Sequence, residues 1–450
     1  MKIYTISGYN EVGKNMTVVD LGDDAIIIDA GAHIPALIEL QEENEFRKGP
    51  YTEKELKKAG AIPDDSILDK KDIRKKVRAI LLGHAHLDHI GAVPYIGYRY
   101  KAPVVGTPFT TAVLKRILQD EGIKIPNKIK NVDPNASYTI KGKKRNYRVD
   151  FINTTHSTPQ TAMIAIHTPE GVILYANDFK LDKTPVLGLP PNYKALKELG
   201  KKGVKALIVD ALYSGSERKT HSEKIARAMV EESLLTINNQ DSAIFVSTFS
   251  SHVARLKSIV EYSKQMKRDV YFIGRSLKKY TLAAKDAGVC PFFKDIKQIG
   301  SYRNQVESIL RKVEKNRKKS LVVCTGHQGE AGSIMDRLAT KKLPFKFKQN
   351  DNVVFSSKTI PTPINIAQKG NMDKKLKKLG VRIFDNVHVS GHGGREDLRD
   401  LISMVNPENI IPSHGPLEKV TPMVELAREM GFKANKGCHI MQDGQMIEFK

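Results

Sequence analysis

The chain has 450 residues, of which 40% are hydrophobic and 27% charged, so it is expected to be soluble and globular and to need two domains. No apolar run is long enough to span a membrane, and the N-terminus lacks the architecture of a signal peptide, so the expected location is cytoplasmic. The three cysteines are far apart and form no CxxC pair, so neither a disulfide framework nor a cysteine zinc site is indicated.

The charge is strongly basic, with 73 Lys and Arg against 50 Asp and Glu and a net charge of +23. Such an excess indicates a polyanionic partner, and nucleic acid is the first candidate. A basic proteome or adaptation to heat would give the same excess, so charge alone leaves these explanations open.

The N-terminal region predicts three strands, over residues 2–7, 16–21 and 25–29, and the third closes on Asp29. Further along, the apolar run 79–82 predicts another strand, and residues 90–95 predict the first turns of a helix. The turn between them reads HAHLDH, at residues 84–89, and holds three of the 13 histidines and one aspartate. Imidazole nitrogens and carboxylate oxygens are ligands that zinc accepts, so this turn predicts a metal site rather than a chance surface cluster.

Four later strands also end in a histidine or an aspartate. Residues 151–155 lead to His156, residues 172–177 to Asp178, residues 206–209 to Asp210, and residues 409–413 to His414. Each residue alone is unremarkable, because a lone histidine at a strand end is more often structural. Together they provide further ligands of the kind that the HAHLDH turn needs.

Between residues 220 and 355 helices alternate with strands, which predicts a parallel sheet with helices on its faces. Three of these strands end in polar turns, at residues 248–252, 274–276 and 325–330. Helix capping explains any single turn, but three at the carboxyl ends of parallel strands predict a phosphate-binding crevice. Residues 356–365 are predicted to be a return linker, because Pro361 and Pro363 disfavour a helix.

The segment HVSGHG follows at residues 388–393. In an extended segment successive side chains alternate between two sides, so His388, Ser390 and His392 are expected on the same side.

Taken in order, these motifs resemble the β-CASP branch of the metallo-β-lactamase nucleases. The stretches at residues 11–16, 177–180 and 325–330 narrow the resemblance to the ribonuclease J group. The chain stops at Lys450, directly after the catalytic core, so it resembles the compact archaeal form, which lacks the extra C-terminal domain of the bacterial enzymes. His327 stands where that family has a smaller residue, which leaves its role open.

The resemblance implies an α/β fold, namely a metallo-β-lactamase αββα sandwich with an inserted β-CASP domain, a parallel sheet flanked by helices. The expected domains are residues 1–210 for the first part of the sandwich, 211–360 for the insertion, and 361–450 for the return segment.

The resemblance also implies a site for two divalent metal ions, with zinc as the first choice. The first ion would be held by His84, His86 and His156, the second by Asp88, His89 and His414, and both by Asp178. Asp29 would either prop the metal-binding turn or cap a loop. The other implied residues are Asp210 and His392 at the scissile phosphate, His388, Ser390 and His392 on the RNA backbone, and Ser250, Ser251, Arg275 and Ser276 around a terminal phosphate.

The implied activity is hydrolysis of RNA by a hydroxide that two metals activate, mainly from the 5′ end and with a preference for 5′-monophosphate RNA. An endoribonuclease of the cleavage-factor type is the alternative. A small-molecule hydrolase of the lactonase kind is disfavoured by the HVSGHG segment, the insertion and the charge of +23. A metal-free RNA-binding scaffold would lack ligands, and here all seven are present. Single-stranded RNA is the expected partner, a homodimer and an RNA-decay assembly are left open, and no membrane partner is expected.

Overall fold

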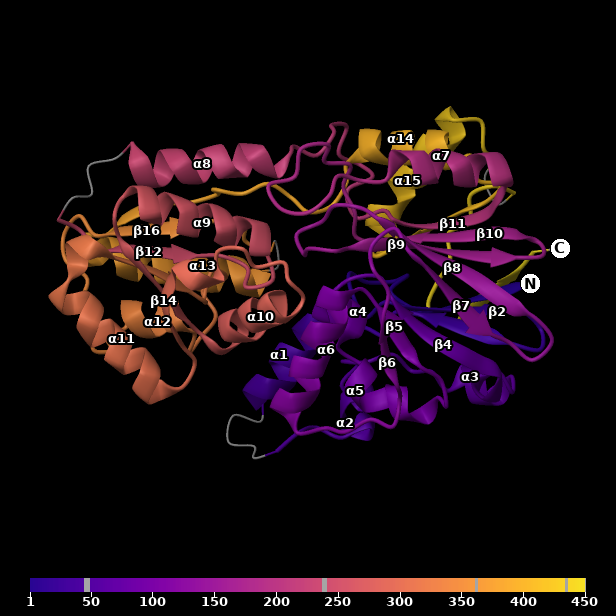
Figure 1. Ribbon diagram of the computed structural model, residues 1–450, viewed down its shortest axis with the longest axis horizontal. Coiled ribbons are helices and arrows are strands. Elements are labelled where there is room, and N and C mark those ends of the chain that lie inside the picture. Colours follow the sequence, from indigo (N-terminus) through magenta and orange to yellow (C-terminus); the bar gives the residue numbers. More distant parts are fainter. Residues whose placement is uncertain (44–48, 237–240, 361–362, 434–435, 450) are drawn as a thin grey trace. The chain divides into compact units, whose positions relative to one another are not determined.

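The computed structural model describes residues 1–43, 49–236, 241–360, 363–433 and 436–449 (Figure 1). The chain divides into two compact units. The first unit comprises residues 1–183, 189–220 and 391–450, and the second comprises residues 184–188 and 221–390.

The first unit contains a seven-stranded sheet in the order β19-β1-β2-β3-β4-β5-β6. Neighbouring strands are antiparallel from β19 to β3 and parallel from β3 to β6. Its strands are β1 (Lys2–Ser7), β2 (Met16–Asp20), β3 (Ala25–Ile28), β4 (Val77–Leu82), β5 (Val104–Gly106), β6 (Ile129–Asn131) and β19 (Gln445–Glu448).

A second sheet of six strands has the order β18-β11-β10-β9-β8-β7, and β10, β11 and β18 run parallel to one another. Side chains from both sheets, such as Ile28, Leu81, Phe151 and Ile208, form one buried cluster, so the sheets pack face to face. The strands are β7 (Ser137–Lys141), β8 (Asn146–Asn153), β9 (Ala162–Thr168), β10 (Gly171–Ala176), β11 (Val204–Asp210) and β18 (Ile410–Ser413).

Helices cover the outer faces of both sheets. On the second sheet, α7, α14 and α15 lie together, and their apolar side chains share a core with β10 and β11 (Figure 1). On the first sheet, α6 packs on β5 and β6. This αββα arrangement confirms the fold class expected from the sequence. The helices of this unit are α1 (Ile34–Glu43), α2 (Glu53–Lys58), α3 (Ile67–Lys70), α4 (Leu87–Ile90), α5 (Val93–Ile96), α6 (Pro108–Glu121), α7 (Tyr193–Lys202), α14 (Arg395–Val405) and α15 (Leu417–Glu429).

The second unit is built on a parallel sheet of six strands in the order β14-β13-β15-β12-β16-β17, as the alternation of helices and strands predicts. The strands are β12 (Ile244–Ser247), β13 (Asp269–Ile273), β14 (Ile296–Gly300), β15 (Ser320–Cys324), β16 (Asn352–Phe355) and β17 (Arg382–Phe384). The helices are α8 (Glu223–Leu235), α9 (Val253–Gln265), α10 (Arg275–Asp286), α11 (Arg303–Lys315), α12 (Ile334–Ala339) and α13 (Pro363–Lys378). Among the described residues, no helix is both long and apolar enough to cross a membrane.

The boundaries of the units differ from those expected at residues 210 and 360. The predicted linker over residues 356–365 is wrong at its end, because α13 begins at Pro363; a proline at the first helical position loses no hydrogen bond. Pro361 lies outside the described residues. Beyond α13, β17 pairs with β16, so the second unit continues to Ser390. The loop 211–220 belongs to the first unit, where Ala211 and Thr220 donate backbone hydrogen bonds to Ser413 and Asp397.

A buried ion pair joins three parts of the second unit. Arg255 in α9 is fully buried and donates to both carboxylate oxygens of Glu223 in α8, at 2.7 and 3.0 Å. Its guanidinium also donates to the Ser356 hydroxyl at 2.8 Å and to the Val387 carbonyl at 2.9 Å. Burial alone would raise the pKa of Glu223, but His252 and Arg255 outweigh it and hold that pKa well below its usual range. Arg255 therefore ties α8 to the chain that leads into the HVSGHG segment.

We expect Arg255→Ala to lower the free energy of unfolding by about 3–5 kcal/mol, because Glu223 would remain buried without its main charged partner. The matched control is Arg227→Ala, since Arg227 forms a partly exposed pair with Glu261, and such pairs are worth about 0–1 kcal/mol. Urea denaturation followed by circular dichroism measures both variants. Equal losses of stability would show that burial adds nothing to the Arg255 pair.

Candidate metal centre

The predicted metal ligands come from strand ends in both sheets of the first unit. The HAHLDH turn follows β4, while His156, Asp178 and His414 follow β8, β10 and β18. The structure brings all seven together in two groups, and within each group the nitrogen and oxygen atoms lie within 4.8 Å of one another. The first group is His84, His86, His156 and Asp178, and the second is Asp88, His89 and His414; a further group consists of His392 with Asp178 and His414.

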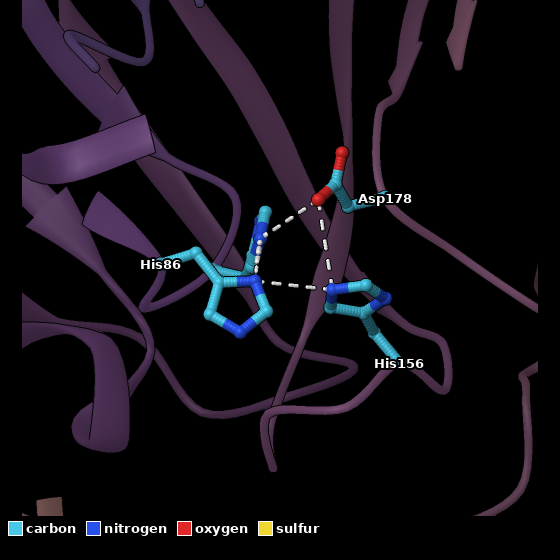
Figure 2. Close-up of side chains that lie close together, drawn as sticks. His86, His156 and Asp178 are labelled. Carbon is cyan, nitrogen blue, oxygen red and sulfur yellow. Dashed lines mark hydrogen bonds and ion pairs between the residues drawn. The ribbon is translucent and has the colours of Figure 1, made fainter. Parts of the chain in front are cut away.

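Asp178 lies between the two groups. Its Oδ2 atom is 3.3 Å from His84 Nε2 and 3.5 Å from His156 Nε2. Its Oδ1 atom is 3.3 Å from His89 Nε2 and 3.5 Å from His414 Nε2. Figure 2 shows the carboxylate beside the rings of His86 and His156. Asp178 Oδ2 therefore faces two imidazole nitrogens of the first group, and Oδ1 faces two of the second group.

The residues present fit a pair of divalent cations. Asp178 Oδ1 is buried and accepts no hydrogen bond. Burial, reinforced by the charge of His84, lowers the pKa of His86 to about 3, so this ring is neutral, as a metal ligand must be. At His89, burial opposes protonation, but Asp178 and Asp29 outweigh it and raise the pKa well above its usual value. The same carboxylates would favour a cation in place of that proton, and a set of nitrogen and oxygen donors suits zinc.

Strained and tightly packed backbone holds the site. Asp29, Asp178 and His414 have φ angles of 60°, 56° and 63°, in the left-handed region that is costly for residues other than glycine. At Gly31, a Cβ atom would lie 1.6 Å from the carbonyl oxygen of Asp88, so only glycine allows this approach. Such strain persists where the surrounding structure enforces it, and it is common at functional sites.

Hydrogen bonds fix the orientation of the imidazole rings. Asp29 Oδ2 accepts from His89 Nδ1 at 2.7 Å, and Asp29 Oδ1 accepts from the Gly83 amide at 2.9 Å. His156 Nδ1 donates to the Gly391 carbonyl at 2.8 Å. In both rings the Nδ1 atom is occupied, so the Nε2 atom turns toward Asp178. Asp29 therefore contacts both the HAHLDH turn, through His89, and the backbone just before it, at Gly83.

Sequence reasoning missed the part played by Asn15. Its amide Nδ2 lies 3.0 Å from His89 Nε2 and 3.0 Å from His414 Nδ1, and it donates to the Asp88 carbonyl at 3.1 Å. A single asparagine between two strands carries no periodic signal and no metal-ligand signal. The sequence segment that contains Asn15, residues 11–16, supported the family resemblance but did not indicate a role for this residue.

Asp210 and His392 form a pair at the edge of the cluster. His392 Nδ1 donates to Asp210 Oδ2 at 2.7 Å. Burial would lower the pKa of His392, but Asp210 and Asp178 outweigh it and raise that pKa to about 9. The His392 ring lies 5.0 Å from the His156 ring and 5.5 Å from the His414 ring, measured between centroids.

The residues predicted to contact RNA belong to both units. His388 and Ser390 are in the second unit, and His392 is in the first. All three are partly exposed, while Val389 and Gly391 between them are buried, so burial alternates as it does in an extended chain. No strand is assigned to this segment.

The predicted phosphate-binding residues lie at the carboxyl end of the parallel sheet. The hydroxyls of Ser250 and Ser276 are hydrogen-bonded to each other at 2.9 Å, so the turns after β12 and β13 meet there. Ser251 is buried, and Arg275 is exposed as the first residue of α10. The His327 ring packs on Phe249 at 4.2 Å, and burial, with the nearby charge of Lys369, lowers its pKa to about 4.

Comparison with known families assigns a description to each part of the chain. "Metallo-beta-lactamase superfamily" matches residues 9–228, and "Ribonuclease J, beta-CASP domain" matches residues 241–369. "Zn-dependent metallo-hydrolase RNA specificity domain" matches residues 378–436.

Whole proteins match over the full length of the chain. Ribonuclease J of Methanocaldococcus jannaschii is 39% identical over 451 residues, covering 100% of this chain and 99% of the relative. Ribonuclease J of Pyrococcus abyssi is 41% identical over 455 residues, covering 100% of this chain and 97% of the relative. A crystal structure of a protein of unknown function from Enterococcus faecalis, 18% identical, has the same fold with a TM-score of 0.64 over 99% of both chains. Together with the cluster of histidines and aspartates, these matches confirm the resemblance found in the sequence: the chain belongs to the ribonuclease J family of the metallo-β-lactamase superfamily.

Proposed function

We propose that this protein is a metal-dependent ribonuclease that hydrolyses RNA phosphodiesters, mainly from the 5′ end, and prefers 5′-monophosphate RNA. The observation that carries this proposal is the buried carboxylate of Asp178 between two groups of imidazoles. Relatives at 39% and 41% identity that are named ribonuclease J support RNA as the substrate, as does the net charge of +23.

In this proposal, the seven clustered ligands hold two divalent ions, with zinc as the first choice. Such ions, when bound, lower the pKa of a water molecule toward neutrality and stabilise the negative charge of a phosphodiester transition state. The protein's own contribution is rigidity, because Asp29, Asn15 and the Gly391 carbonyl keep the rings in place before substrate arrives.

His392 is the proposed proton donor or electrostatic support for the leaving oxygen. Asp210 accepts a hydrogen bond from His392 Nδ1–H, so the Nε2–H group is the one left to face the substrate. In the metal-free protein, burial lowers the pKa of this ring, but Asp210 and Asp178 outweigh it and raise the pKa to about 9, which favours the protonated form. The rings of His156 and His414 beside it place His392 next to the proposed metal ligands.

The direction of cleavage is proposed from the second unit. Ser250 and Ser276 meet at the carboxyl end of the parallel sheet, where backbone N–H groups at helix starts favour phosphate. A pocket there that holds one terminal phosphate would fix which linkage is cut and would release mononucleotides. The alternative is an endoribonuclease of the cleavage-factor type, which shares the chemistry and needs no free 5′ end.

We expect His86→Ala and Asp88→Ala to lower kcat by roughly 10³-fold or more. Each variant lacks one proposed ligand of the metal ions, which would supply several kcal/mol of transition-state stabilisation. RNA binding should stay within about threefold of the unmodified protein, since phosphate contacts supply most of the affinity. Cleavage assays, filter binding and metal analysis of the purified variants measure the three effects. A parallel loss of binding and cleavage would contradict this division of roles.

We expect His392→Ala to lower kcat by about 10²–10³-fold while the metal content stays at the unmodified level. Asp210→Asn should cost less, about 10–100-fold, because it weakens the orientation of a ring that remains present. Metal analysis beside the kinetics is the deciding measurement. If His392→Ala loses an equivalent of metal, its role is that of a ligand and not of a proton donor.

We expect Arg275→Ala and Ser251→Ala to erode the preference for 5′-monophosphate over 5′-triphosphate RNA by about tenfold, the loss of one charge-assisted hydrogen bond. Arg303→Ala is the matched control, because Arg303 is likewise exposed and begins a helix, α11. Labelled RNAs with either 5′ end, together with circular RNA, give the readout by product length. Cleavage of circular RNA as fast as linear RNA would identify an endonuclease and remove the pocket.

A further inference from the structure

Tyr213 is an aromatic residue beside the metal cluster that the mechanism above does not use. It lies in the loop 211–220, three residues after Asp210, and 37% of it is exposed. Its ring centroid is 5.9 Å from that of His392, with the planes tilted by 50°. Since His392 contacts the rings of His156 and His414, Tyr213 is one ring away from the proposed metal ligands.

The backbone around Tyr213 is held from several sides, so the exposure of the ring is not a consequence of a loose loop. The Ala211 amide donates to the Ser413 carbonyl at 3.0 Å, next to His414. The Ser214 hydroxyl donates to the Lys419 carbonyl at 2.8 Å. The Arg395 amide donates to the Ser216 carbonyl at 2.8 Å. These contacts fix both ends of the turn that carries Tyr213.

The surroundings of the ring suit a nucleotide. Exposing an aromatic face to water is unfavourable, and a flat apolar ring next to cationic groups is the usual platform for a base in single-stranded RNA. The His392 ring, which is hydrogen-bonded through Nδ1 to Asp210, lies next to the Tyr213 ring. Arg218 in the same loop is exposed, and it is close enough for its positive charge to act on the Tyr213 hydroxyl.

We propose that Tyr213 is a substrate-binding residue on which a base of the RNA next to the scissile phosphodiester stacks. This inference rests on the proposed ribonuclease function and names the part of the substrate that the rim of the site recognises. The contact is with the flat face of the base, which every base has, so it raises affinity for RNA without selecting a sequence.

The test compares Tyr213→Ala and Tyr213→Phe with the unmodified protein on single-stranded 5′-monophosphate RNA. The matched control is Tyr98→Ala, because Tyr98 is an exposed tyrosine of the same unit whose hydroxyl donates to Glu53 at 2.7 Å. Tyr213→Ala should raise KM about tenfold, the loss of one base–aromatic stack, with kcat within about twofold. Tyr213→Phe and Tyr98→Ala should leave both constants within about twofold, and all variants should keep the metal content.

A second substrate separates stacking from other roles. In an RNA of the same length, abasic residues flank the linkage that is cleaved first, so no base can stack there. On this RNA, the unmodified protein and Tyr213→Ala should have the same KM within about twofold, because the interaction is already absent.

Several results would overturn the inference. An equal penalty for Tyr213→Ala on normal and abasic RNA would show that the ring does not bind a base. A loss of kcat in Tyr213→Phe would assign the role to the hydroxyl, and a loss of metal in Tyr213→Ala would make the ring a structural support. If the unmodified protein cleaves RNA while Tyr213→Ala matches it throughout, the stacking fails and the proposed function stands. If the unmodified metal-loaded protein cleaves neither RNA, both fail.

Discussion

The interaction on which the site depends is the contact of one buried carboxylate, Asp178, with four imidazole nitrogens. A carboxylate without water is costly unless positive charge or hydrogen bonds surround it. Burial would raise the pKa of Asp178, but His414, His89 and the other nearby histidines outweigh it and hold the pKa well below its usual value. The nitrogens are 3.3 to 3.5 Å away, which is long for a charge-assisted hydrogen bond and leaves the two sides of the carboxylate suited to a stronger cation.

The packing of the two sheets in the first unit brings the residues of this contact together. The parallel strands β3 and β4 bring Asp29 and the HAHLDH turn to one end of the first sheet, while β10, β11 and β18 bring Asp178, Asp210 and His414 to one end of the second. Because the sheets pack face to face, both ends supply ligands to one place. The left-handed backbone at Asp29, Asp178 and His414 then turns three side chains inward, at a cost that the surrounding core sustains.

In the second unit, too, the ends of parallel strands bring polar turns together, here on a single sheet. Its six parallel strands present their turns at one edge, and Ser250 and Ser276 meet there although β15 lies between their strands. The buried Arg255 connects this unit to the HVSGHG segment by holding the Val387 carbonyl. Four residues after Val387, the Gly391 carbonyl accepts a hydrogen bond from His156 in the first unit. A short stretch of sequence therefore takes part in the framework of both units.

Much of the fold and of the candidate site could be predicted from the sequence, because clustered metal-ligand residues and strand periodicity are local patterns. The HAHLDH turn crowds ligands into six residues, and the apolar runs before His156, Asp178 and His414 mark strands that the structure contains. Asn15 could not be found in this way, because its role depends on the approach of β1 and β2 to residues 74 and 399 positions further along. The helix at Pro363 was misjudged, since proline ends a helix from inside but is favourable as its first residue.

By itself, the sequence determined which chemistry the chain can perform, since ligand type, ligand order and the excess of basic residues are properties of composition and spacing. Only the tertiary structure decided which atoms face one another: Asp178 between two histidine groups, Asp29 behind His89, Asp210 behind His392, and Tyr213 beside them. The physical reason is that these residues are far apart in the sequence, 60 positions for Asp29 and His89 and 182 for Asp210 and His392, and no local pattern reports how close two distant side chains will be. Packing of the two sheets sets those distances.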